Sequence, residues 1–493
     1  MNDVLSFGAD ISIVCAVLLL AVFSNRVSER FGVPAPAIFL VCAAVASDVV
    51  PDLTPRSIEN VQGIVTVALV VILFNGGMGI GWSRFRRNGA AIIWVGAAGT
   101  VVTAVALALA AHWLFSFDWR MALLLGTALS PTDPAVVFSV LGRREVAGRT
   151  GTLLEGESGA NDPVGIALMV AIISSSRSAS DVGAVVTAVQ TFALQMGVGA
   201  AVGWAGGRLL VLMMRRLPLP SEGLYAIRVL AAAGLIYGVT TVVHGSGFLA
   251  VFVAGILVGD ERAPYKREIE RFHAALASLG EIVAFTVLGL TVTVHSLTRG
   301  NALGIGLALA ALLAFVIRPV LVGLVLLPVR LTRAERAFVL WAGLKGAVPV
   351  LLGTYILTSG GGGDGGRAYG IVFIVVLFSV VVQGGLVPWV AARLRLPVRV
   401  VEQEPWSVGL RLRDEPQGLH RYTVRRGAAA DGKALDDLSL SEGVWISLIG
   451  RAGRLVQVRG DTELCAGDEV IVLAEEADAG VLEELFTHRL PKS

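Results

Sequence analysis

Long apolar stretches separated by short polar loops run along residues 8–391. Most are near the roughly 20 residues that a helix needs to cross a bilayer. The pattern therefore predicts a polytopic α-helical membrane protein with about thirteen transmembrane helices. The expected spans are 8–25, 34–50, 58–81, 89–115, 119–141, 150–173, 184–214, 224–243, 246–259, 277–295, 302–328, 335–358 and 368–391.

Composition agrees with a membrane protein. Hydrophobic residues make up 55% of the chain and charged residues only 16%, whereas soluble domains carry about 25% charged residues. Mean hydropathy is +0.74. The three cysteines, Cys15, Cys42 and Cys465, have neither disulfide nor metal-ligand spacing, and we expect them to be packing residues.

Basic residues gather in alternate loops. One such loop holds Arg26 and Arg30, and the last holds Arg393, Arg395 and Arg399. Because basic loops face the cytoplasm, this alternation predicts a multi-pass protein of the cell (inner) membrane, with its N-terminus outside and its C-terminus inside. An odd number of spans requires the same arrangement.

Several spans carry polar or charged residues near their midpoints. A charge there costs about 2.5–3.5 kcal/mol on insertion scales and is usually retained for ion or proton handling. We expect these side chains to converge on one layer of the membrane. A single residue of this kind could simply make an interhelical hydrogen bond, but the carboxylates favour an ion site. The residues are Asn75, Thr132, Asp133, Ser158, Asn161, Asp162, Arg318 and Lys345.

The run Leu154-Glu-Gly-Glu-Ser-Gly-Ala-Asn-Asp-Pro163 has the strongest pattern. In a helix, Ser158 lies four residues before Asp162 and three before Asn161, so a hydroxyl, an amide and a carboxylate share one face. These are hard oxygen ligands suited to a small cation.

Two spans contain prolines that interrupt a helix: Pro131 and Pro134 in span 119–141, and Pro349 in span 335–358. Broken helices matched between two halves point to a transporter site. The two spans are seven apart in order, and this odd offset predicts two inverted six-helix repeats joined by span 184–214. A proline kink without function is the alternative, which suits one span better than a matched pair.

These motifs resemble the signatures of the cation/proton antiporter superfamily, in its electroneutral sodium/proton exchanger branch. They are Thr-Asp-Pro at 132–134, Glu-Ser-Gly-Ala-Asn-Asp at 157–162 and Trp-Ala-Gly-Leu-Lys-Gly-Ala-Val-Pro at 341–349, within a resemblance over residues 8–392. The resemblance implies a homodimeric transporter, not an enzyme, with thirteen helices in two inverted repeats and crossed broken helices.

The resemblance also implies roles for the residues of the layer. Asp162 would bind either the cation or a proton, and Ser158, Asp133 and the Thr132 backbone would complete the monovalent-cation site. Asn161 takes a position that is a second aspartate in electrogenic relatives.

The resemblance also bears on the ion pair of Glu157, and the sequence departs from the family pattern at two positions. Glu157 would pair with a basic residue, with Arg318 the first choice over Lys345. Asn75 stands where related exchangers usually have an acidic residue, which leaves ion selectivity open. Lys345 stands where arginine is general; it keeps the charge but loses the bidentate fork. We expect it to neutralise the broken-helix region, with proton carriage as the alternative.

The chain changes character after the spans. We expect a transmembrane antiporter domain at 1–399, a linker at 400–418 and a small α/β cytoplasmic domain at 419–493, with short strand-like runs and a helix at 477–486. This tail resembles the TrkA C-terminal domain, also written RCK_C. Such domains pair as dimers, and several bind a nucleotide messenger such as cyclic di-AMP. A dimerising module without a ligand is the alternative.

The combination resembles potassium/proton antiporters of the cell-volume-regulation type. We therefore expect electroneutral alternating-access exchange of potassium, rather than sodium, for protons, regulated through the tail, with no covalent cofactor and no nucleic-acid partner. A sodium/proton antiporter of the same fold is one alternative. A cation channel gated by the tail is another, although the sequence has no Thr-Val-Gly-Tyr-Gly filter. A membrane-tethered enzyme finds no support in the six scattered histidines.

Overall fold

The chain forms two compact units, Met1–Ser407 and Val408–Ser493. The computed structural model describes residues 34–487 and five isolated positions before residue 34. Its gaps are at 51–52, 54, 56, 142–143, 147–148, 176–180, 262, 293–296, 298–300, 360–361, 397, 401–418, 439, 442–443, 452–453 and 475–477. Most of the predicted span 8–25 and nearly all of the predicted linker 400–418 therefore lie outside the described residues.

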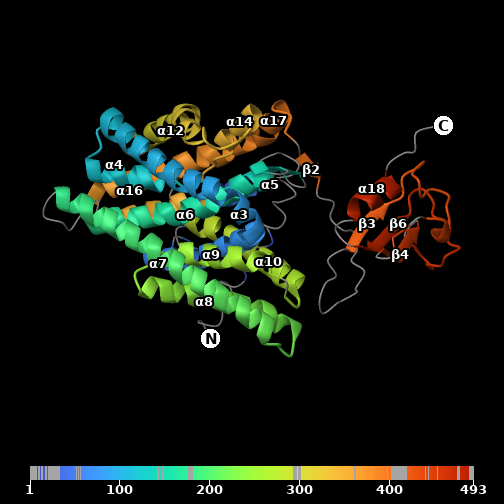
Figure 1. The fold of residues 1–493 in the computed structure, drawn as a ribbon. Coiled ribbons are helices and arrows are strands. Elements are labelled where there is room, and N and C mark those ends of the chain that lie inside the picture. Colours follow the sequence, from blue (N-terminus) through green and yellow to red (C-terminus); the bar gives the residue numbers. More distant parts are fainter. Residues whose placement is uncertain are drawn as a thin grey trace. The chain divides into compact units, whose positions relative to one another are not determined.

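The first unit is built from helices (Figure 1). Within the described residues, six helical stretches are long and apolar enough to cross a membrane, and α2, α9 and α15 are shorter apolar helices. The count of thirteen spans stays a prediction. The bounds are α2 Ala35–Val49, α3 Ile58–Phe115, α4 Trp119–Ala128, α5 Ala135–Leu141, α6 Arg149–Ser175, α7 Asp181–Arg216, α8 Glu222–Val242, α9 Gly247–Gly259, α10 Lys266–Leu290, α12 Ala302–Leu312, α13 Gly323–Val325, α14 Arg333–Trp341, α15 Ala347–Thr358, α16 Gly362–Phe378 and α17 Gly385–Arg393, with π-helical segments η3 Leu313–Val322 and η4 Ser379–Gly384.

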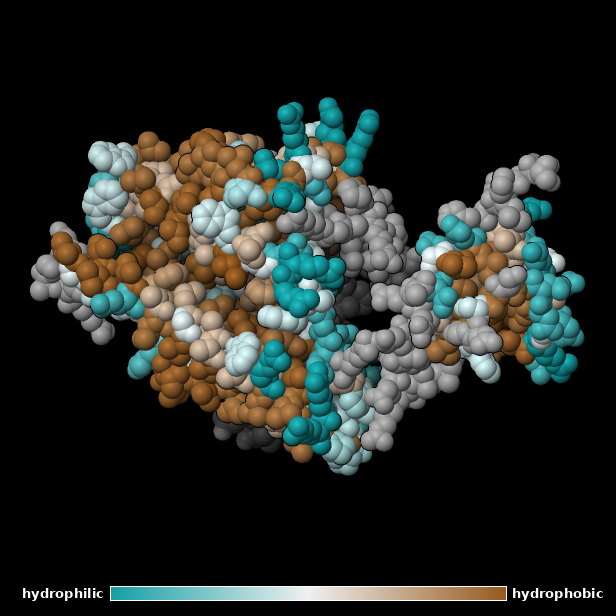
Figure 2. Space-filling view, viewed as in Figure 1, coloured by the Kyte–Doolittle hydropathy of each residue, from teal (hydrophilic) through white to brown (hydrophobic). Residues whose placement is uncertain are grey.

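The outer surface of this unit is apolar. Hydrophobic side chains cover much of the face seen in Figure 2, and large ones such as Trp113, Val182 and Leu235 are well exposed. Apolar patches of this extent mark surfaces that contact a membrane or a partner. Together with the apolar helices, this surface identifies a multi-pass membrane protein.

Helix α3 corresponds to the two predicted spans 58–81 and 89–115. The helix does not end in a loop at 82–88, as we expected, but bends at Gly81, whose φ is +68°. A Cβ at this position would lie 2.3 Å from Asp260 Oδ1, and the Asp260 carboxylate accepts the Ser83 amide hydrogen. A glycine with left-handed φ thus separates two helical segments without a loop.

Helix α10 begins at Lys266, well before the expected start of its span at 277. The added turns are amphipathic and charged, and Lys266 forms an ion pair with Glu270 at 3.2 Å. Hydropathy identifies only the apolar portion of a helix, so the expected span omits the polar first turns of α10.

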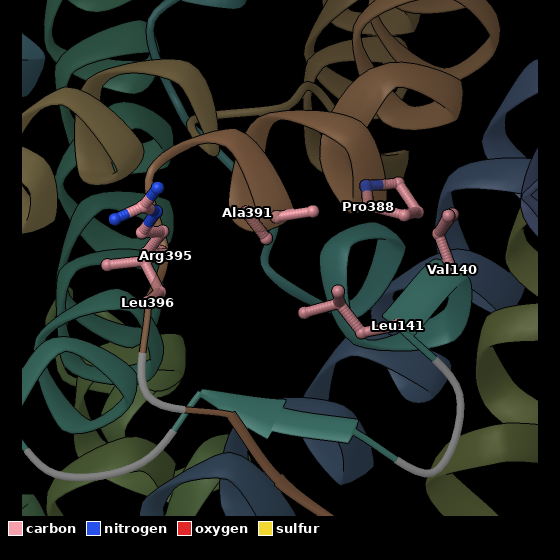
Figure 3. Close-up of a pocket in the computed structure, with 7 residues that line it drawn as sticks. Val140, Leu141, Pro388, Ala391, Arg395 and Leu396 are labelled. Atoms are coloured by element: carbon pink, nitrogen blue, oxygen red, sulfur yellow. The ribbon is translucent and has the colours of Figure 1, made fainter.

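A short two-stranded ribbon lies at one end of the helical unit. Strand β1 Arg144–Val146, between α5 and α6, pairs antiparallel with β2 Val398–Val400, which follows α17. Beside it, a cavity of about 360 Å³ opens between α5 and α17 (Figure 3). None of the predicted ion-site residues lines this cavity. Its lining is Val140, Leu141, Pro388, Ala391, Ala392, Arg395 and Leu396.

The second unit is a four-stranded antiparallel sheet in the order β3-β6-β4-β5, with helix α18 Ala479–Thr487. The strands are β3 Leu419–Thr423, β4 Trp445–Arg451, β5 Arg454–Val456 and β6 Glu469–Leu473. Its own core includes Ile449, Val470, Val472, Leu482 and Phe486. Strand β3 pairs antiparallel with β6 from Leu419 to Thr423.

Candidate functional site

Two helices are interrupted at the centre of the first unit. The chain between α4 and α5 is non-helical at Pro131 and Pro134. The chain between α14 and α15 is non-helical at residues 342–346, just before Pro349 in the first turn of α15. These stretches touch: the Asp133 amide donates to the Leu344 carbonyl at 2.8 Å. Gly346 makes this approach feasible, because a Cβ there would lie 1.9 Å from Asp133 Oδ2.

Lys345 joins the two interrupted helices. Its side chain is buried, and Nζ donates to the carbonyls of Ser130 at 3.0 Å and Pro131 at 2.9 Å. Because Pro134 has no N–H, the Ser130 carbonyl lacks the partner it would have in a continuous helix. The lysine supplies that partner together with a positive charge.

Helix α6 presents its polar face to this crossing. Ser158, Asn161 and Asp162 are all buried, and Asn161 Nδ2 donates to Thr132 Oγ1 at 2.6 Å. Asp162 lies within electrostatic range of both Asp133 and Lys345.

Two oxygens on this face lack donors. Asn161 Oδ1 and Asp162 Oδ1 are buried and accept no hydrogen bond from the described residues. Buried polar atoms are nearly always satisfied. Unpaired acceptors beside a carboxylate are what a bound cation or proton would satisfy.

An ion pair supports α6 one turn before Asp162. Arg318 Nη2, on η3, donates to Glu157 Oε1 at 3.0 Å, and each side chain is only 4% exposed. The arginine also donates through Nε to the Leu340 carbonyl at 2.9 Å. A Cβ at Gly343 would lie 1.7 Å from Arg318 Cζ, so the glycine leaves room for the guanidinium group.

The remaining predicted residues are placed as follows. Asp133 is half-buried, and its Oδ1 accepts the Ala135 amide hydrogen at 2.9 Å at the start of α5. Asn75 is half-buried on α3, and no hydrogen bond among the described residues links it to the crossing. Glu157 contacts Arg318, whereas Lys345 binds carbonyl oxygens.

Three polar residues near this region were missed from the sequence. Ser379 Oγ, on η4, accepts the Lys345 amide hydrogen at 3.0 Å and donates to Gln383 Oε1 at 2.8 Å. Glu281, on α10, lies within electrostatic range of Asp133. Polar residues within the apolar spans 368–391 and 277–295 were the available signal.

Both units match described families. Residues 14–393 match the family described as "Sodium/hydrogen exchanger, transmembrane", and residues 419–487 match the TrkA-C domain. The K(+)/H(+) antiporter NhaP of Alkalimonas amylolytica is 32% identical over 477 residues, which cover 95% of this chain and 81% of that protein. The K(+)/H(+) antiporter NhaP2 of Shewanella baltica is 30% identical over 495 residues, covering 99% and 84%.

A solved structure shares the fold. The sodium proton antiporter MjNhaP1 from Methanocaldococcus jannaschii aligns at a TM-score of 0.64 with 20% sequence identity, over 76% of this chain and 98% of that chain. A second structure of the same antiporter aligns at 0.66 over 81% and 99%.

Proposed function

The chain belongs to the sodium/hydrogen exchanger family and is a cation/proton antiporter, and from this premise we propose that it exchanges potassium for protons by electroneutral alternating access. The observation that carries the proposal is Asp162, whose buried Oδ1 has no donor partner among the described residues and lies near the crossing of two broken helices. A carboxylate in this setting suits exchange between a cation and a proton.

In the proposed cycle, a monovalent cation binds ionised Asp162 with oxygens of Ser158, Asp133 and the Thr132 backbone. A proton competes for the same carboxylate. The site crosses between the two membrane faces only when one of them neutralises it, because an uncompensated charge at this depth is costly. Competition for one group couples the two fluxes.

The net charge moved in each exchange cycle depends on Asn161. The amide is neutral, so one titrating carboxylate, rather than two, carries the exchange on this helix. One cation then moves for each proton. Glu157, Arg318 and Lys345 hold the surrounding elements and stay charged throughout the cycle.

Potassium is favoured because the relatives that align over nearly the whole chain are named as K(+)/H(+) antiporters. The neutral Asn75 is consistent with a less charged site. Proton flux in proteoliposomes, compared over a series of potassium and sodium concentrations, tests this selectivity. A tenfold preference for sodium would reverse the assignment.

The central test is Asp162→Asn in proteoliposomes, with Asp364→Asn, at an exposed position of α16, as the matched control. We expect the first variant to insert and fold but to lose cation-dependent proton flux, and the control to retain it. Near-normal exchange by Asp162→Asn would contradict the mechanism. Cation flux without proton movement in the unmodified protein would favour a channel.

The proposed assembly is a homodimer in the cell (inner) membrane, with the N-terminus outside. Residues 1–399 form the transport domain and 419–493 a cytoplasmic regulatory domain that pairs in the dimer and binds a nucleotide such as cyclic di-AMP. The match to the TrkA-C domain supports this arrangement. Mass measurement of the detergent-solubilised protein tests the dimer.

A further inference from the structure

Glu281 is a carboxylate that the mechanism above does not use. It lies on α10 among small and apolar residues, with Gly280 against Ala68 of α3 and with Ala284 and Phe285 fully buried. Its Oε1 is buried and accepts no hydrogen bond from the described residues. A buried carboxylate oxygen without a donor requires an explanation, because desolvation of an unpaired charge is costly.

Glu281 lies within electrostatic range of Asp133. Asp133 also acts on Asp162. Asp133, on the interrupted α4–α5 chain, therefore lies within electrostatic range of both Glu281 on α10 and Asp162 on α6.

Among the described residues, the four helices with the most contacts to α10, namely α2, α3, α8 and α15, bring no opposite charge to its middle. Helix α15 has no charged residue, α2 has only Asp48 near its end, α8 has Glu222 in its first turn and Arg228 in its second, and α3 has Glu59 in its first turn and a basic group around its bend. Arg228 donates to the carbonyls of Met213 and Leu217. Lys266 and Glu270 pair with each other in the first turns of α10.

A structural role would provide Glu281 with a partner. Two other buried acids illustrate this: Glu157 binds Arg318, and Asp468 in the second unit binds Arg451. Two carboxylates within electrostatic range of each other in a low-dielectric site favour uptake of a proton or a cation, since ionising both is unfavourable.

We propose that Glu281 is a further cation- and proton-binding carboxylate of the exchange site, which acts with Asp133 on a monovalent cation approaching Asp162. The proposal rests on the function proposed above. In this proposal α10 contributes an acidic side chain to the site, whereas Asn75 on α3 is neutral. A cation would then contact Glu281 and Asp133 either on its way to Asp162 or after it leaves Asp162.

The test uses Glu281→Gln and Glu281→Asp in the full chain, with Glu268→Gln in the first turn of the same helix as the control. In proteoliposomes, we expect Glu281→Gln to raise the potassium concentration for half-maximal exchange by about tenfold, equivalent to about 1.4 kcal/mol. The acid limb of the activity profile should move to lower pH, because the remaining carboxylates lose a negative neighbour. Glu281→Asp should restore part of both properties.

A second measurement does not depend on the variants being active. In the unmodified protein, dicyclohexylcarbodiimide should label the protonated Glu281 carboxyl, as detected by mass spectrometry, and potassium should protect it. An unchanged potassium response and pH profile in Glu281→Gln, or labelling that potassium does not affect, would overturn the proposal. Active Asp162→Asn would instead overturn the function on which it rests.

Discussion

Arg318 on η3 and Glu157 on α6 form a buried ion pair with Nη2 and Oε1 3.0 Å apart. The same guanidinium group donates to the Leu340 carbonyl at the end of α14. One side chain therefore connects the helix that carries Asp162 to the end of an interrupted helix. The pair aligns two elements of the crossing without touching Asp162 itself.

Removing one member of this pair should destabilise the fold. Glu157→Gln leaves Arg318 buried without its counter-charge, and breaking a buried pair in this way costs about 3–5 kcal/mol. We expect a clear drop in the midpoint of thermal unfolding in detergent. Glu261→Gln is the control, because its partner Arg215 is 62% exposed and exposed pairs contribute about 0–1 kcal/mol. Equal shifts for the two variants would contradict this account.

A methyl group at position 346 should disable exchange. Gly346→Ala would place Cβ 2.3 Å from Asp133 Cβ, while the Asp133 amide is held by Leu344. The two interrupted stretches must then separate, and we expect exchange in proteoliposomes to fall by about tenfold or more. Gly238→Ala on α8 is the control, since no atom lies within 4 Å of its added Cβ. Full activity of Gly346→Ala would argue against a close crossing.

A second carboxylate beside Asp162 should make transport sensitive to voltage. Asn161 donates to Thr132 Oγ1; in Asn161→Asp, the threonine hydroxyl can donate instead, so the contact survives. A potential of 100 mV acts with about 2.3 kcal/mol on each net charge moved. We expect turnover by Asn161→Asp, but not by the unmodified protein, to respond to an imposed potential. A strong response of the unmodified protein would exclude one-for-one exchange.

The second unit should lose stability in acid. Burial raises the pKa of Asp468, but hydrogen bonds from Arg451 and the Cys465 amide outweigh it, so that the pKa lies below its ordinary value. A lowered pKa in the folded state stabilises above the unfolded pKa of about 3.9, and the stabilisation is lost as pH falls through the folded pKa. We expect about 1.5–3 kcal/mol of unfolding free energy to depend on these bonds.

Denaturant unfolding of residues 408–493, which have their own core, measures this effect between pH 7 and pH 2. Asp468→Asn should lower stability at pH 7 and flatten the acid decline. Asp461→Asn, at an exposed position, should behave like the unmodified domain. An acid decline of the same size in Asp468→Asn would assign it to other groups.

Removing the tail should separate transport from regulation. A chain ending at about residue 405 should retain basal exchange but lose any response to cyclic di-AMP, because a ligand acts only through its differential affinity for states of the tail. Calorimetry on the isolated domain with a panel of adenine nucleotides measures binding directly. No binding, together with unchanged transport on truncation, would leave the tail a structural module.

Local chemistry made the interrupted helices predictable from the sequence. Pro131 and Pro134 lie in the break between α4 and α5, and Pro349 lies in the first turn of α15, directly after the second break. Residue type alone does not decide a break, since Pro163 lies inside the continuous helix α6. The family and the TrkA-C domain were also identified correctly from short motifs. The site roles and the inverted repeat remain predictions.

Features that depend on packing were not predictable in this way. At the bend of α3, Gly81 packs against Asp260, which is far away in sequence. The π-helical segments carry Arg318 and Ser379 into the centre, but no local pattern indicates which turn will widen. Glu281 lies inside the expected span 277–295, but only the fold brings this side chain within electrostatic range of Asp133.

The pairing of β1 with β2 links two parts of the first unit just after α17. Residue 400 is opposite Arg144, and Val398 is opposite Val146. A pull on the backbone at residue 401 would therefore reach the turn between α5 and α6 through this ladder as well as α17 along the chain. Because β1 lies between α5 and α6, a force on β2 would act on both the helix after Asp133 and the helix that holds Asp162. The ribbon thus couples the connection between α5 and α6 to the chain that follows α17.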